Sequence, residues 1–362
     1  MNFPRMGKVL SAPGLLKKVR ACFDLIPETC DTVPDYPLTD VLMNAMAIFG
    51  LKCGSMLKFD GQRKTAAFKN NLKNLYGVPA SPCDTQIRDR LDPVNPEHLR
   101  PAFKAVHQTL QQQGVLQDFM FMEGYYLLNI DGTGIFSSEK VHCPHCCEKH
   151  KSNGKTEYYH QMLEAVIVHP DKSVVLPLCP EPVIREDGQN RNDCERNAAK
   201  RLLRKIKEDH PRMKFIVVED GLFGNGPHIR LLSELGYAFI IVVKENDHKE
   251  LFDSIQKQMR DGKTEEFEIK DEKGTVRGYR FMNGVPLNKS NPDILVNYLD
   301  FWEISGEGKS KQWIWITCIP LNRETVSPVE KGGRNRWKIE NETFNTLKNQ
   351  GFNLEHNYGH GK

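Results

Sequence analysis

Two kinds of hydrophobic pattern follow one another along the chain. From residue 38 to residue 120, apolar positions recur every three to four residues, and the segments end at glycine or proline. This spacing is typical of amphipathic helices that end at helix-breaking residues. We therefore predict an all-helical N-terminal domain over residues 1–121, a candidate for DNA binding, and a second domain over residues 122–362.

Short apolar strands dominate the pattern after residue 121. A first strand over residues 124–136 is predicted to end in a glycine-rich turn, and residues 170–172 are a hairpin signal between the next two strands. A basic helix, a buried strand, a short helix and a further strand follow. This order predicts an α/β fold with a mixed sheet flanked by helices. Residues 246–318 hold charged, alternating segments and predict a β-rich insertion or the far edge of the same sheet.

The amino-acid composition indicates the cellular compartment in which the protein works. With 39% hydrophobic and 27% charged residues, the chain has the balance of an ordinary globular protein. Its longest apolar run, residues 237–243, is far too short to span a bilayer, and the N-terminus lacks the apolar core of a signal peptide. The ten cysteines lack the even framework of a small secreted domain and fit a reducing compartment. We therefore expect a cytoplasmic protein without a membrane partner.

Positive charge is concentrated in a few segments, although the net charge is only +3. The basic segments are residues 61–74, 196–214 and 331–338. Such segments can bind the phosphate backbone of a nucleic acid, or they can be solvated helix surfaces. The sequence leaves both interpretations open.

Residues 332–351 predict one short amphipathic helix that ends at a glycine. On a helical wheel of about 100° per residue, Glu340 falls within the apolar stripe and Glu342 falls on the opposite face. The stripe consists of Trp337, Phe344 and Leu347. An ionised carboxylate on a core face is costly unless it is paired or binds a metal. The sequence therefore singles out Glu340, either as the partner of Arg336 in an ion pair or as a metal ligand.

Two aspartates are predicted at strand ends. Asp131 ends the alternating strand "YYLLNIDG" and Asp220 ends the apolar strand "FIVVEDG". Acids at the carboxyl ends of strands lie where α/β folds bind their ligands, although each alone is also a common turn residue. Together with Glu340 they could hold a pair of Mg²⁺ ions, which prefer oxygen ligands. Two such ions about 3.5–4 Å apart can clamp the attacking and leaving oxygens of a phosphoryl transfer.

These acids lie in three blocks that resemble a known family. The blocks are "NIDGTGIF" with Asp131, "VVEDGLFGNGPHIRLLSELGYAFIIVVKE" with Asp220 and "RWKIENETFNTLK" with Glu340. They resemble the motifs of DDE transposases of bacterial insertion sequences, in the group with the signature Tyr-x2-Arg-x3-Glu-x6-Lys. The resemblance covers about residues 123–358. It implies an RNase H-like catalytic core with a β-rich insertion between the second acid and the glutamate.

The third block departs from that signature at two positions. Arg336 and Glu340 match Arg-x3-Glu, but the tyrosine position holds Gly333. Lys348 follows Glu340 after seven residues instead of six, and Leu347 occupies the expected lysine position. Many members of the family also continue beyond a segment like "NLEHNYGHG", so we expect this chain to be a truncated copy.

The resemblance implies a chemistry and its partners. Asp131, Asp220 and Glu340 would hold two Mg²⁺ ions, which Mn²⁺ can replace. The DNA phosphates would contact Arg336, Lys348 and Lys244. The reaction would be cleavage at the ends of a mobile element and strand transfer into target DNA, by a homodimer assembled on the terminal inverted repeats in the bacterial nucleoid. Two alternatives stay open: an RNase H-like nuclease that does not join strands, and a catalytically decayed copy that only binds DNA.

A cysteine–histidine cluster lies between the first two predicted strands of the second domain. The segment "VHCPHCCEKH" contains Cys143, Cys146, Cys147 and His150, and Cys143-x2-Cys146 has the spacing of half a zinc knuckle. His150 or His160 could complete a structural Zn²⁺ site that holds this loop. The alternative is a set of free thiols, with His160 as a core histidine of its strand.

Overall fold

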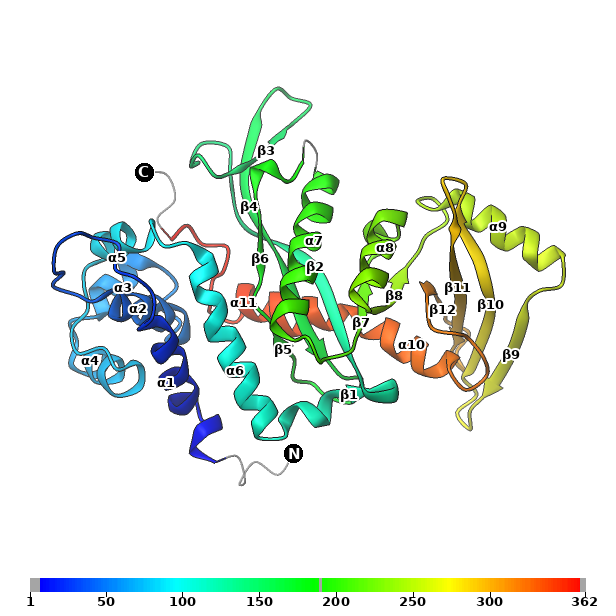
Figure 1. The fold of residues 1–362 in the computed structure, drawn as a ribbon, viewed down its shortest axis with the longest axis horizontal. Helices are drawn as coiled ribbons and strands as arrows, with labels where there is room; N and C mark the ends of the chain where they lie inside the picture. The colour runs from blue at the N-terminus through cyan, green and yellow to red at the C-terminus, as the bar shows by residue number, and fades with distance from the viewer. Residues whose placement is uncertain (1–6, 189–190, 359–362) are drawn as a thin grey trace. The chain divides into compact units, whose positions relative to one another are not determined.

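The computed structural model describes residues 7–188 and 191–358 (Figure 1). The chain forms two compact units, and each unit is built from segments that are far apart in the sequence. Unit 1 consists of Met1–Asp118, Thr133–Met162 and Thr343–Lys362, and unit 2 consists of Phe119–Gly132 and Leu163–Glu342. The predicted domain boundary at residue 121 stays a prediction.

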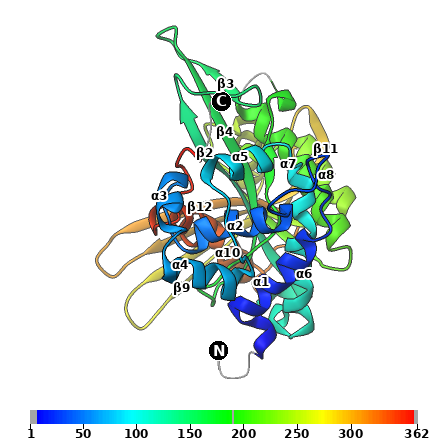
Figure 2. The ribbon, with the colours of Figure 1, turned by 90° about the vertical axis from the view of Figure 1, so that its left-hand side faces the viewer.

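Unit 1 contains the helices of the N-terminal region (Figure 2, blue to cyan). They are α1 (Ala12–Phe23), α2 (Leu38–Gly50), α3 (Met56–Gln62), α4 (Ala66–Asn71), α5 (Asp84–Leu91) and α6 (Arg100–Gln112). Their apolar faces meet in one core, in which Val41, Phe59 and Ile87 are fully buried. The helical pattern predicted for this region is confirmed.

The hydrophobic pattern does not show where α2 ends and α3 begins, because apolar residues keep helical spacing across the break between them. Between α2 and α3, Lys52 (φ 54°) and Gly54 (φ 75°) take left-handed backbone conformations. Ser55 then caps α3, because its side chain accepts a hydrogen bond from the Lys58 N–H. Glycine adopts such angles without steric cost and serine is a favoured N-cap, so the local sequence contains the break that apolar spacing conceals.

Unit 2 is built on a mixed sheet. Its strands are β1 (Met120–Phe121), the first part of β2 (Tyr125–Ser138), the last part of β4 (Thr156–Val168), β5 (Leu176–Pro177), β6 (Glu181–Val183), β7 (Phe215–Glu219), β8 (Ala238–Val242), β9 (Glu265–Lys270), β10 (Val276–Asn288), β11 (Asn291–Ile304) and β12 (Ser310–Thr317). The main strand order is β4-β2-β7-β8-β12-β11-β10-β9. The pairs β2–β7 and β7–β8 are parallel, and the pairs from β8 to β9 are antiparallel. This mixed sheet with flanking helices confirms the predicted α/β class and is consistent with an RNase H-like fold.

Helices alternate with the central strands as predicted. α7 (Arg191–Asp209) precedes β7, and α8 (Gly226–Leu235) precedes β8. β7 is buried along its whole length, as expected for a central strand of a parallel sheet covered on both faces. α8 begins after the N-cap Asn225 and ends where Gly236 takes a φ of 71°, which are common start and stop signals. None of the helices in the described parts of the chain combines the length and apolar character needed to cross a membrane.

The predicted β-rich insertion forms β9 to β12, which extend the sheet beyond β8 (Figure 1). It also contains a helix, α9 (Lys249–Arg260), which the sequence-based prediction lacks. The buried residues of α9 are Leu251, Phe252 and Ile255. Apolar residues recur along α9 at the spacing of an amphipathic helix, so the signal was present in the sequence, although the charged, alternating segments around it were interpreted as strands.

The long strand β2 corrects another prediction. β2 continues to Ser138, so the glycine-rich turn predicted after Asp131 is wrong. Gly132 and Gly134 take no positive φ angle and continue as extended backbone. Glycine weakens a strand interior without ending it. Asp131 therefore lies inside a strand and not at its end.

The C-terminal glutamate lies in an irregular helical run instead of the single helix predicted. α10 (Val326–Arg334) is followed by a 3-10 turn (Asn335–Trp337), a π-helical segment (Ile339–Phe344) and α11 (Asn345–Asn349). Two glycines of α10 pack closely on the sheet of unit 2. A Cβ at Gly332 would lie 2.9 Å from Ile240 Cδ1, and one at Gly333 would lie 2.5 Å from the Trp315 indole. This close approach fixes the position of α10 on the sheet.

A carboxyl group is buried in the part of β4 that belongs to unit 2. Glu164 is only 4% exposed, and burial raises the pKa of this carboxyl to about 8. The unfolded chain has the ordinary, lower pKa, so the folded state holds a proton that the unfolded state releases. The stability contributed by this proton is fully present below pH 4.5 and is lost as the pH rises towards 8.

We expect Glu164→Gln to reduce the loss of stability between about pH 5 and pH 8, because glutamine has no proton to release. One proton corresponds to a slope of about 1.4 kcal/mol per pH unit in the free energy of unfolding. Urea unfolding across this range measures the slope, and Glu272→Gln, at an exposed position, is the control. Equal slopes in Glu164→Gln and the unchanged protein would contradict the prediction.

Candidate active site

Asn129 and Asp131 join β2 to the C-terminal helical run. They lie two residues apart on the strand and therefore on the same face. Asn129 is fully buried, and its Nδ2 donates to the carbonyl oxygens of Asn335 at 2.6 Å and Arg336 at 3.2 Å. The Asp131 carboxylate accepts a hydrogen bond from the Gly132 N–H at 2.8 Å. These contacts hold the helical run beside the Asp131 carboxylate.

Arg336 connects two of the predicted acids. Its Nη1 donates to Asp131 Oδ2 at 3.1 Å, and its Nη2 donates to Glu340 Oε1 at 3.2 Å. The side chains of Arg336 and Asp131 are 25% and 22% exposed. The ion pair between Arg336 and Glu340 that the sequence suggested is therefore present, and it extends to Asp131. One guanidinium group holds two carboxylates that lie far apart in the sequence.

The helical wheel misplaces part of the buried face around Glu340. Trp337, predicted in the apolar stripe, is 51% exposed, whereas Ile339 is fully buried. The side chain of Glu340 is 49% exposed, so the prediction that it points into the protein is wrong. The 3-10 and π segments turn through different angles per residue than an α-helix, so the apolar face shifts around the axis. Glu342 is exposed, as predicted.

Asp220 directly follows β7. Its carboxylate caps the 3-10 turn Gly221–Phe223 and accepts a hydrogen bond from the Leu222 N–H at 3.0 Å. The turn packs tightly, because a Cβ at Gly224 would lie 2.7 Å from His248 Nε2. The end of a buried strand and a tight turn thus fix the Asp220 carboxylate.

The Asp131 carboxyl is affected by burial and by the charges around it. The pKa of Asp131 is about 6, above its ordinary value, mainly because the carboxyl is partly buried. The charges of Asp220 and Glu340 raise this pKa further, whereas the Arg336 guanidinium and the Gly132 N–H lower it. A charge shifts a pKa appreciably only when it is near. Asp131 and Glu340 share Arg336 and the charge of Asp220 acts on Asp131, so we call these three acids of unit 2 the acidic cluster.

A cavity of about 860 Å³ in unit 2 includes part of this cluster in its walls. Its charged lining consists of Arg196, Asp220, Lys244, Asp247, Lys249, Glu250 and Arg336. Lys244, a predicted phosphate ligand, thus lines the same cavity as Asp220 and Arg336. The volume is in the range of ligand-binding pockets, and its positive groups suit an anionic ligand.

The carboxylate oxygens of the acidic cluster are spread apart. Among residues 7–188 and 191–358, three potential metal ligands whose ligand atoms all lie within 4.8 Å of one another occur in unit 1, at Cys143, Cys146 and His160. The three acids do not meet this criterion. In the acidic cluster, the Arg336 guanidinium pairs with two of the three carboxylates. The donor set still fits Mg²⁺, which prefers carboxylate oxygens. Burial is the main cause of the raised pKa of Asp131, and a nearby divalent cation would favour the charged form of this carboxyl.

The hydrophobic pattern does not reveal the side chains that support the acids. Glu219, the residue before Asp220, is fully buried, and its Oε2 lies 2.7 Å from Nε2 of buried His228 on α8. This pair joins the end of β7 to α8 across the turn that holds Asp220. Asn129 is a second such residue. In the sequence, such a residue can be found as a polar residue within an otherwise apolar strand. A polar group buried there needs a hydrogen-bond partner, so it indicates a specific contact.

Two cations of the C-terminal region are engaged in local contacts. Lys348 pairs with Glu355 at 2.7 Å within unit 1, and its contact with DNA phosphate stays a prediction. Lys338, in the basic segment 331–338, donates to three backbone carbonyl oxygens of residues 169–172. Its ammonium group therefore anchors the turn between β4 and β5.

The basic segment 196–214 is partly structural as well. Arg201 and Lys205 each lie 2.6 Å from a carboxylate oxygen of buried Glu181 on β6. Arg196 differs, because its Nε donates to the Leu222 carbonyl and its side chain lines the cavity beside Asp220. Of these three cations, Arg196 is therefore the one suited to contact a ligand in the cavity.

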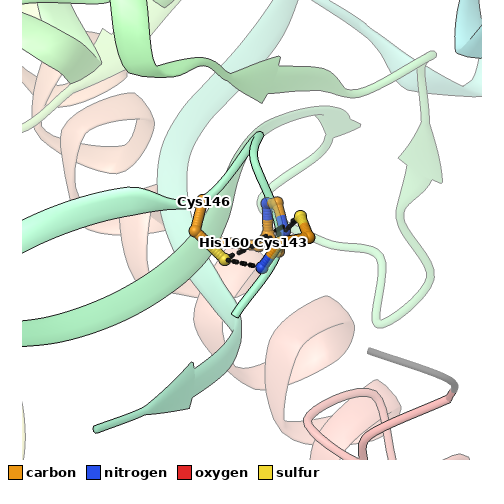
Figure 3. Close-up of side chains that lie close together, drawn as sticks. All are labelled: Cys143, Cys146 and His160. Atoms are coloured by element: carbon orange, nitrogen blue, oxygen red, sulfur yellow. Dashed lines mark hydrogen bonds between the residues drawn. The ribbon is translucent and has the colours of Figure 1, made fainter. Parts of the chain in front are cut away.

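The predicted cysteine–histidine cluster forms a compact group in unit 1. Figure 3 shows Cys143, Cys146 and His160 with their sulfur and nitrogen atoms directed toward one another. Cys147 and His150, which the sequence also suggested, lie outside this group, and His150 Nδ1 lies 3.0 Å from a threonine hydroxyl instead. His160, interpreted from its strand mainly as a core histidine, lies next to both thiols.

The fold and the three acidic blocks agree with one class of protein, an RNase H-like enzyme. A family model for the transposase DDE domain matches residues 125–362, which is more than half of the chain. The chain belongs to the DDE transposase family. A comparison with curated proteins gives no match. Membership of this family implies a DNA-binding enzyme of transposition, and DDE transposases generally use divalent metal ions.

Proposed function

We propose that this protein is the transposase of a bacterial insertion sequence. It would cleave DNA at the ends of the element and join the freed 3′-hydroxyl to a phosphodiester of target DNA. The observation that carries the proposal is the acidic cluster, in which Asp131 and Glu340 share the Arg336 guanidinium and Asp220 raises the pKa of Asp131. The match to the transposase DDE domain supports the same reaction class.

Asp131, Asp220 and Glu340 are the proposed ligands of two Mg²⁺ ions, which Mn²⁺ can replace. When bound, the two ions supply Lewis-acid stabilisation to the attacking and leaving oxygens of the phosphoryl transfer. Each carboxylate comes from a different element: strand β2, the turn after β7, and the π-helical segment. The hydrogen bonds of Asn129 and Asp220 restrict the motion of these elements and so preorganise the carboxylates.

Arg336 and Lys244 are the proposed contacts to the phosphate backbone beside the cleaved bond. Both line the cavity that contains Asp220. A guanidinium group can bind a phosphate through two parallel hydrogen bonds, and an ammonium group binds it as a point charge. Lys348 is proposed to contact the same DNA. The full partners would be the terminal inverted repeats and target DNA, with a homodimer assembled on them.

A strand-transfer assay tests this function. The purified protein is incubated with Mg²⁺, a target plasmid and a duplex from the DNA that flanks its gene, with a pre-cut 3′-hydroxyl. Covalent joining of the duplex to the plasmid is the expected result. Metal-dependent cleavage without a joined product would favour the RNase H-like nuclease instead. DNA binding without either reaction would favour the catalytically decayed copy.

A further inference from the structure

We propose that Cys143, Cys146 and His160 form a zinc site in unit 1, chemically distinct from the acidic cluster. Cys143 and Cys146 lie at the two ends of a tight turn, in which the Cys146 N–H donates to the Cys143 carbonyl at 3.2 Å. The Cys143 N–H also donates to the Cys146 sulfur at 3.4 Å. His160 reaches the two thiols from β4. The zinc ion would fasten this turn to the strand.

The distances between the three ligand atoms match tetrahedral zinc (Figure 3). His160 Nε2 lies 3.5 Å from Cys143 Sγ and 3.6 Å from Cys146 Sγ, and the two sulfurs are 4.0 Å apart. Zinc binds sulfur at about 2.3 Å and nitrogen at about 2.0–2.1 Å, which places tetrahedral neighbours about 3.5–3.8 Å apart. The three atoms therefore already lie close to three corners of a zinc tetrahedron.

Strand register selects these three ligands from the larger cluster. β3 (Cys147–His150) pairs antiparallel with β4, and Cys147 is opposite Tyr159. Side chains alternate along a strand, so Cys147 faces away from the side on which Cys146 and His160 meet. His150 lies four residues from Cys146, about 13 Å along an extended strand, which is beyond the reach of a shared ion. Both residues are therefore matched controls.

The chemistry of the group favours zinc over the alternatives. Two sulfurs and an imidazole form a borderline-soft donor set that suits zinc, whereas Mg²⁺ and Ca²⁺ prefer oxygen. A disulfide would need the sulfurs at about 2.05 Å, far closer than the 4.0 Å observed. Three protein ligands leave the fourth tetrahedral position to water.

Metal analysis of the full-length protein tests the site. After purification under reducing conditions, elemental analysis is expected to find about one zinc per chain. Cys143→Ser, Cys146→Ser and His160→Asn should each lose most of this zinc, while Cys147→Ser and His150→Asn keep it. A protein that contains no zinc and binds none on titration would overturn the proposal. Equal zinc content in all five variants would overturn it as well.

Cobalt substitution tests the site first in the unchanged protein, where no variant has to fold. The unchanged protein loaded with Co²⁺ is expected to show strong visible absorption from a tetrahedral ion and a thiolate-to-cobalt charge-transfer band. A weak spectrum typical of six oxygen ligands would overturn the site. Asp131→Asn should keep the full cobalt spectrum. Failure of the zinc site and failure of the proposed active site are thus distinguishable.

Discussion

The Glu340→Gln variant is expected to lose cleavage and strand transfer while it keeps its fold. Glutamine matches glutamate in size but lacks the negative charge that favours binding of a hard divalent cation. A ligand that contributes about 4 kcal/mol of transition-state stabilisation accounts for a rate lower by about 10³-fold. The side chain of Glu340 is 49% exposed, and Arg336 keeps Asp131 as a partner. The substitution therefore leaves no unpaired charge in the core.

Glu342→Gln is the matched control for this experiment. Glu342 is exposed and belongs to the same π-helical segment, two residues from Glu340. Cleavage rates with Mg²⁺ on an element-end duplex should stay unchanged in this variant, and gel-shift binding should persist in both. If Glu340→Gln cleaved DNA at the original metal-dependent rate, Glu340 would not belong to the active site.

The position of Asp220 at the end of a strand could be predicted, because the residues next to it in the sequence determine that position. A short apolar run followed by an acid and a glycine predicts a buried strand and a turn, and Asp220 does follow β7 directly. The place of Asp131 is not determined by local signals alone. Glycines in a turn and glycines in an extended strand look the same in sequence. The pairing of β2 with β7 ends at Asn129, so the part of β2 beyond Asp131 depends on its other neighbour in the sheet, β4. Strand length therefore depends on partners that the local pattern does not contain.

The geometry around Glu340 depends on a residue far away in the sequence. Asn129 Nδ2 donates to the Asn335 and Arg336 carbonyls, which a regular α-helix would pair with N–H groups four residues later. The helix type changes at this point, and the constant angle of a helical wheel no longer applies. The spacing Arg-x3-Glu still identified Arg336 and Glu340 as partners, because neighbours at i and i+4 remain close in this run.

In the cysteine–histidine cluster, too, local spacing predicts one part of the site and distant contacts determine the rest. The spacing Cys-x2-Cys predicted that Cys143 and Cys146 would lie together, since two residues suffice for a tight turn. The choice between His150 and His160 depends on how β3 and β4 align. A shift of the register by one residue would turn His160 to the other face of the hairpin. Sequence spacing can therefore suggest the cysteines, but strand pairing selects the histidine.

Gly333→Tyr, which restores the tyrosine of the family signature, is expected to prevent unit 2 from folding. A single Cβ at this position would lie 2.5 Å from the Trp315 indole, and Trp315 is fully buried. Gly333→Ala should lower the free energy of unfolding by about 1–3 kcal/mol, the usual cost of overpacking a rigid core. Gly61→Ala is the control, because Gly61 lies in a helix with no atom within 4 Å of its Cβ position. Urea unfolding measures the difference.

A double-mutant cycle with Trp315→Phe decides what the missing tyrosine means. Phenylalanine lacks the indole nitrogen that a Cβ at Gly333 would meet, and this nitrogen has no hydrogen-bond partner among the described residues. Gly333→Ala should therefore cost less in the Trp315→Phe background, by about 0.5–3 kcal/mol, the range for residues in contact. Such coupling would mean that Trp315 fills the space beside position 333, so that glycine there is a packing requirement and no sign of a decayed active site. Additive effects would contradict this account and leave the loss of tyrosine as support for the decayed copy.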